Sequence, residues 1–122
     1  MTACLTPGPA TRALYDRLRL RYFMDAEPPL RVPPPSSAIR WLWVSERGPN
    51  HAVTHFDPEE DPHTVELALD LRRSWRHLRL TLLHELTHMR DPRAGCGSRG
   101  GRPGARWLRE QARLAALGAP LL

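Results

Sequence analysis

The chain has 122 residues, of which 41% are hydrophobic, so it is long enough for one modest core and we expect a single domain spanning 1–122. No stretch approaches the roughly 20 apolar residues of a membrane span. The N-terminus lacks the basic region and apolar run of a secretory leader. Two cysteines, Cys4 and Cys96, are too few for the disulfide framework of a small secreted domain. We therefore expect a cytoplasmic protein without membrane contact, and a monomer.

The net charge is +5, and all 18 basic residues are arginine. Such uniform use of arginine is more typical of codon bias than of a nucleic-acid site. The stretch between Arg90 and Arg113 nevertheless contains seven arginines against only Asp91 and Glu110. DNA contact through an arginine-rich surface is therefore kept as an expectation, without a motif to support it.

The first half of the chain predicts one helix and three strands. Residues 1–10 are expected to be a loose terminus. Apolar residues at helical spacing predict a helix over Thr11–Asp25, with Thr11 as its N-cap. The strands are expected at Ile39–Val44, Ala52–Phe56 and Thr64–Leu69, where β-branched, aromatic or alternating apolar residues occur.

The second half predicts two helices. The first runs from about Ser74 to Arg90 and is stopped by Asp91-Pro92. The glycine- and arginine-rich segment 95–104 is expected to be a loop. The last helix spans about Ala105–Leu117 and ends at Gly118. The order indicates an α+β fold in which an N-terminal helix, a three-stranded, mostly antiparallel sheet and two helices follow one another.

The motif with chemical meaning is His84-Glu85-Leu86-Thr87-His88. Two histidines four residues apart on a helix project from one face and can both reach a tetrahedral Zn²⁺. Glu85 follows the first histidine, so its carboxylate lies beside the metal, where it can take a proton from water. By chance the pattern would occur only about 0.02 times in such a chain. The alternative is two hydrogen-bonded histidines at the edge of the core with an unrelated glutamate.

The third zinc ligand is open. An extended zincin motif would place glycine at position 91 and a ligand at 94, where this chain has Asp91 and Ala94. Glu110 is the preferred candidate, because a carboxylate on the apolar stripe of a short helix is costly unless it is paired or bound to metal. Its alternative role is an ion pair with Arg106, Arg113 or a neighbouring helix.

Other donors are weighed behind Glu110. Cys96 is a second option, although a glycine-rich loop is a poor place to hold a thiolate. Asp91 is better placed as a helix cap or as a partner of a ligand. His51 or His55 could approach from the sheet, whereas His77 is two helical turns from His84.

The chain resembles the SprT-like (Spartan-type) zincin family over about residues 12–117. The segments that carry the resemblance are Leu14-Tyr15-Asp16 to Tyr22-Phe23, Ile39–Val44, Val65-Glu66-Leu67, Thr81–His88 and Gly104-Ala105-Arg106-Trp107. The resemblance implies a minimal zincin-like domain, bound Zn²⁺, and a metallopeptidase that hydrolyses a protein or peptide substrate with His84 and His88 as ligands and Glu85 as general base.

One position departs from that family. Its third ligand is the histidine of a His-Gly pair, and the matching residue here is Pro103. Either Glu110 substitutes for it, or zinc binding is weakened or lost. The second outcome defines the alternative function, a degenerate, non-catalytic SprT-like protein that binds a protein or DNA partner. A structural zinc in a small regulatory protein is a third option.

Overall fold

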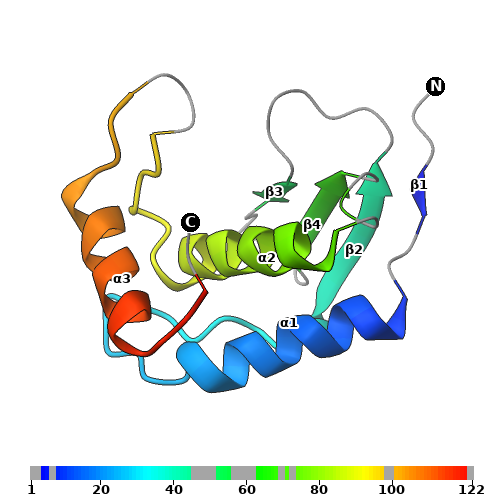
Figure 1. The fold of residues 1–122 in the computed structure, drawn as a ribbon, viewed down its shortest axis with the longest axis horizontal. Coiled ribbons are helices and arrows are strands. Elements are labelled where there is room, and N and C mark those ends of the chain that lie inside the picture. The colour runs from blue at the N-terminus through cyan, green and yellow to red at the C-terminus, as the bar shows by residue number, and fades with distance from the viewer. Residues whose placement is uncertain are drawn as a thin grey trace.

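The computed structural model describes residues 4–5, 8–44, 52–55, 63–68, 71, 74–97 and 101–120, with only the backbone at 4–5, 52–55 and 63. Three α-helices and a mixed sheet make up these residues (Figure 1). The elements in chain order are β1 (Cys4–Leu5), α1 (Pro9–Tyr22), the 3₁₀ turn η1 (Ser36–Ala38), β2 (Ile39–Val44), β3 (Ala52–His55), β4 (His63–Ala68), α2 (Trp75–Arg90) and α3 (Ala105–Ala116). The α+β class expected from the sequence is therefore confirmed.

The sheet differs from the expected three-stranded, mostly antiparallel arrangement. Its described strands follow the order β1-β2-β4-β3, and the central pair, β2 and β4, is parallel. β1 and β3 run antiparallel to their neighbours at the two edges. Because β4 carries Val65 and Leu67, both fully buried, it takes a central position between two partners. β3 then lies within the long connection that a parallel pair requires.

The helices cover one face of this sheet. Trp41 is in register with Val65, and Trp43 with Leu67, so these four side chains share a face. They belong to one core together with apolar residues of all three helices. Figure 1 shows α2 lying across the strands, α1 running below it and α3 packed at one end. Arg40, on the opposite face of β2, is exposed.

The N-terminal helix begins earlier than predicted. Gly8 is its N-cap and Pro9 its first residue, whereas Thr11, the expected cap, is buried inside the first turn. Proline begins a helix well because its φ is already helical and the amide it lacks would be unpaired there. Cys4 and Leu5 pair with β2, so the stretch expected to be loose contains a short strand and the start of α1.

The connector after α1 is tied back to that helix. Asp16 accepts hydrogen bonds from the backbone and hydroxyl of Ser36, at 2.8 and 2.5 Å. Tyr15 donates to the carbonyl of Pro34 at 2.7 Å, and burial raises the pKa of its hydroxyl. These bonds hold η1, and with it the start of β2, against α1. No helix in the described residues is long and apolar enough to cross a membrane.

Candidate metal centre

Helix α2 brings the two histidines of the motif together. It begins after Ser74, whose hydroxyl accepts a hydrogen bond from the His77 amide, and it ends at Arg90, as the sequence predicts. Leu78, Leu82 and Leu86 bury one side of the helix. His84 and His88 lie half-buried on a neighbouring stripe, with their Nε2 atoms 3.1 Å apart.

Both imidazoles are held in the neutral form. Burial, and then the nearby His88, lower the pKa of His84 to about 4. Burial also lowers the pKa of His88, against a smaller opposing effect of a hydrogen bond with the Ala94 backbone. Neutral imidazole is the form that ligates metal. At neutral pH the pair therefore presents lone pairs without first having to lose a proton.

Glu85 occupies the position between these two residues and the core. Its side chain is only 2% exposed, although its neighbours His84 and His88 are half-buried. Burial of a carboxylate strengthens its electrostatic interactions, since water no longer screens them. A carboxylate in this position is suited to exchanging a proton with a group held at the two imidazoles.

The third donor near the histidines is Cys96. One ligand atom each of His84, His88 and Cys96 lies within 4.8 Å of the others, and this is the metal-ligating group among the described residues. Around a tetrahedral zinc, two nitrogens are about 3.3 Å apart and a nitrogen and a sulfur about 3.6 Å apart. The histidine nitrogens already have the first spacing. The sulfur lies within 4.8 Å of both, so this donor set fits Zn²⁺.

The loop that carries Cys96 is closed at its base. The amide of Gly104 donates to the carbonyl of Gly95 at 2.8 Å, and the amide of Ala94 donates to the carbonyl of Asp91 at 2.9 Å. Gly97 has a φ of +82°, and a Cβ there would lie 2.7 Å from the carbonyl oxygen of Gly101. The backbone on both sides of Cys96 is therefore fixed.

Trp107, at the start of α3, covers the histidine pair. Its ring centroid lies 4.7 Å from that of His84 and 5.0 Å from that of His88. Trp107 is buried, so the indole leaves the two imidazoles little room to rotate on that side. In the sequence analysis Trp107 belongs only to a segment that carries the family resemblance, and no role at the centre was predicted for it.

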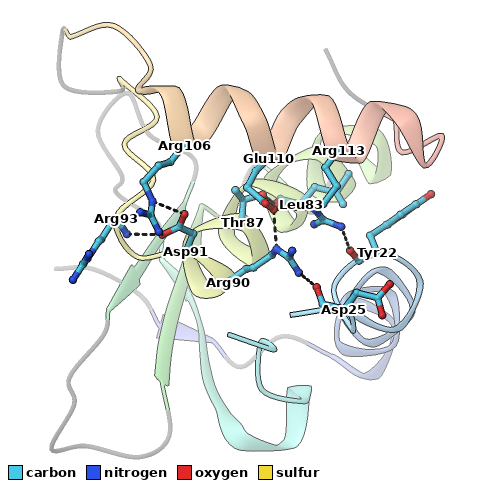
Figure 2. A network of polar contacts seen from close by, with 10 residues as sticks. All are labelled: Tyr22, Asp25, Leu83, Thr87, Arg90, Asp91, Arg93, Arg106, Glu110 and Arg113. Carbon is cyan, nitrogen blue, oxygen red and sulfur yellow. Dashed lines mark hydrogen bonds and ion pairs between the residues drawn. The ribbon is translucent and has the colours of Figure 1, made fainter. Parts of the chain in front are cut away.

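The carboxylate of Glu110 is engaged elsewhere (Figure 2). Its Oε2 lies 2.9 Å from Nε of Arg90 and 3.1 Å from Nε of Arg113, and the residue is 5% exposed. The two guanidinium groups also donate to the carbonyls of Asp25 and Tyr22. Glu110 is not in the group formed with His84 and His88. The expectation that it is the third ligand therefore does not fit this arrangement, because the buried Arg90 and the half-buried Arg113 already neutralise its charge.

Asp91 takes the role of a cap and a clamp. Its carboxylate accepts two hydrogen bonds from Arg106, at 2.8 and 3.0 Å, and one from the Arg93 amide at 3.2 Å. Burial raises the pKa of Asp91, but these bonds outweigh it and the pKa falls below the usual value. Asp91 thus joins the end of α2 to the start of α3, on either side of the Cys96 loop (Figure 2).

The remaining candidates lie away from this group or outside the described residues. His77 is exposed, and so is Pro103, which has no donor. His51 and the side chain of His55 lie outside what the structure describes. The glycines beside Cys96 were interpreted as a poor place to hold a thiolate. Glycines beside a cysteine indicate a tight backbone path as readily as a mobile one, and this interpretation favours Cys96 over Glu110.

Comparison with known proteins adds no relative. No family model matches the chain, and neither a curated protein nor a solved structure does.

Proposed function

We propose that the chain is a zinc-dependent metallopeptidase in which His84 and His88 bind the metal and Glu85 is the general base. The observation that carries the proposal is the 3.1 Å separation of the two Nε2 atoms on α2, with the buried Glu85 next to them in sequence. SprT-like peptidases, which the sequence resembles, use these residue types in the same spacing.

The chemistry divides between metal and protein. When bound, Zn²⁺ supplies Lewis acidity, which lowers the pKa of water and polarises a carbonyl. His84 and His88 would hold the ion through their imidazoles, whose neutral form is favoured by their lowered pKa values. Glu85 accepts a proton from the attacking water and returns it to the amine that leaves when the C–N bond breaks. Trp107 restricts the imidazoles from one side.

An edge strand supports a peptide as the substrate class. Within the described residues β3 pairs with β4 alone, and it lies next to α2. The free side of such a strand can bind an extended peptide through backbone hydrogen bonds. This arrangement favours an unfolded or extended protein segment over a small molecule.

The test compares Glu85→Gln with the wild type. We expect the variant to keep its zinc, because Glu85 is not a ligand, and to lose about 10²–10⁴-fold in the rate of peptide hydrolysis. Metal content is measured by elemental analysis and cleavage by mass spectrometry of a peptide library. Glu27→Gln, at an exposed site on another part of the chain, is the matched control and keeps both properties.

Two outcomes would contradict the proposal. A Glu85→Gln protein that cleaves at the wild-type rate removes Glu85 from the reaction and points to a contaminating peptidase. Wild-type protein that binds zinc but cleaves no peptide favours the non-catalytic alternative, in which the same centre supports binding of a protein or DNA partner.

A further inference from the structure

We propose that Cys96 is the third zinc ligand, so that the centre is a His₂Cys site with a thiolate donor. This inference rests on the proposed function for the presence of zinc and deepens it by assigning the ligand set. It replaces Glu110, which the sequence favours, and it accounts for Pro103 at the position where SprT-like proteins carry a histidine.

The sulfur of Cys96 lies close to the ligand atoms of both histidines. The ligand atoms of His84, His88 and Cys96 lie within 4.8 Å of one another although they come from two separate segments, a helix and the loop that follows it. Cys96 is half-buried, so solvent does not surround its thiol.

The backbone on both sides of Cys96 is held in place by contacts within the loop. The bond between the Gly104 amide and the Gly95 carbonyl closes it, and the left-handed backbone of Gly97 brings it against residues 101–103. The amide of Ala94, two residues before the cysteine, donates to the carbonyl of Asp91 and so ties this side of the loop to the end of α2.

Glu110 is not free to act as the third zinc ligand. Its carboxylate is buried between Arg90 and Arg113, and Arg90 is itself only 5% exposed. Moving Glu110 to the histidines would leave the buried guanidinium of Arg90 and the half-buried one of Arg113 without their counter-charge. Trp107, one turn earlier on α3, already occupies the side of the histidines that faces this helix.

The test reads the ligand directly, without an activity assay. Co²⁺ is substituted for Zn²⁺, because thiolate–Co²⁺ ligation gives an intense charge-transfer band in the near ultraviolet that nitrogen and oxygen ligands lack. We expect this band in the wild type and in Glu110→Gln, and its loss in Cys96→Ser. Zinc affinity should fall in Cys96→Ser by more than the 10–100-fold that removal of an outer-shell partner costs. Cys96→His should restore zinc binding without the band.

A second measurement uses the wild-type chain and does not depend on how any variant folds. Trypsin separates Cys4, in the peptide 1–12, from Cys96, in the peptide 94–99. We expect added zinc to protect the second peptide from iodoacetamide while the first is alkylated at an unchanged rate. Equal alkylation of the 94–99 peptide with and without zinc would overturn the assignment, as would a Co²⁺ protein without the band.

These outcomes separate the ligand assignment from the proposed function. A thiolate band in a protein that cleaves no peptide keeps Cys96 as a ligand and removes the peptidase. Peptide cleavage that depends on Glu85 and zinc, in a protein without thiolate ligation, keeps the peptidase and removes Cys96.

Discussion

Single residues around the centre are constrained by backbone as much as by side chain. Gly97 is the clearest example, since it combines a positive φ with three backbone atoms less than 3.0 Å from where a Cβ would lie. Gly95 and Gly101, in the same loop, have open space at that position. Glycine is therefore required at one of these sites and is merely present at the other two.

This difference gives a prediction within one loop. Gly97→Ala should destabilise the protein by at least about 1–2 kcal/mol, the cost of a left-handed alanine, and should weaken zinc binding because Cys96 is displaced. Gly101→Ala is the matched control and should leave both quantities nearly unchanged. Urea unfolding and zinc titration measure the two effects. Equal behaviour of the two variants would show that the loop does not fix the cysteine.

At the scale of elements, one carboxylate links α3 to the ends of α1 and α2. Glu110 on α3 pairs with Arg90 at the end of α2, and Arg113 donates to the Tyr22 carbonyl at the end of α1 at 2.6 Å. The guanidinium of Arg113 also lies over the Phe23 ring, at 5.2 Å from its centroid. The buried charge of α3 thus has a structural role in packing.

We expect Glu110→Gln to reduce the free energy of unfolding by about 3–5 kcal/mol, because it leaves the buried Arg90, and beside it the half-buried Arg113, without a counter-charge. A loss of this size is a large part of the stability of a small domain. Chemical denaturation measures it, and zinc content of the folded fraction should be unchanged. Loss of zinc with unchanged stability would instead return Glu110 to the metal.

At the scale of the whole molecule, the centre brings together residues of α2, of the loop that follows it and of α3. His84 and His88 belong to α2, Cys96 to the following loop, and Trp107 to the start of α3. Asp91 and Arg106 clamp the same junction. An ion bound here would tie α2 to the loop that leads into α3.

Zinc should therefore raise thermal stability. A ligand that binds only the native state stabilises it by about 4 kcal/mol at a free concentration 1,000 times its dissociation constant. We expect a chelator to lower the Tm of the wild type in differential scanning calorimetry. His84→Ala should have the low Tm from the start and should not respond to the chelator. A chelator response in His84→Ala would place the ion elsewhere.

The structure also changes the interpretation of the arginine-rich stretch from Arg90 to Arg113. Of its seven arginines, Arg90 and Arg113 neutralise Glu110, and Arg106 binds Asp91. Arg93, Arg102 and Arg109 are exposed. Part of the positive charge that suggested a nucleic-acid surface is thus internal structure, and DNA binding stays a prediction.

The sequence predicted the elements better than their arrangement. β2 has the predicted bounds, and α2 and α3 match within one residue, because caps, prolines and apolar spacing are local signals. The pairing of β4 with β2 was missed, since alternation identifies a buried face but neither a neighbour nor a direction.

The sequence likewise predicted part of the candidate site and missed the rest. The sequence placed His84, Glu85 and His88 on one helix from spacing alone. The alternative role of Glu110, an ion pair with Arg113 or a neighbouring helix, is the one the structure shows. Arg90 itself was not identified as the partner, because it lies 20 positions away on another helix and only packing brings the two together. Leu117, expected as the last residue of the final helix, lies just beyond α3 and is exposed.

The contact of Trp107 with both imidazoles has an optical consequence. Of the four tryptophans, Trp41 and Trp43 lie in the core and Trp75 is exposed, whereas Trp107 is in ring contact with His84 and His88. A paramagnetic ion or a protonated imidazole at that distance quenches the emission of an indole. The fluorescence of this single side chain therefore reports what occupies the histidine pair, without any added label.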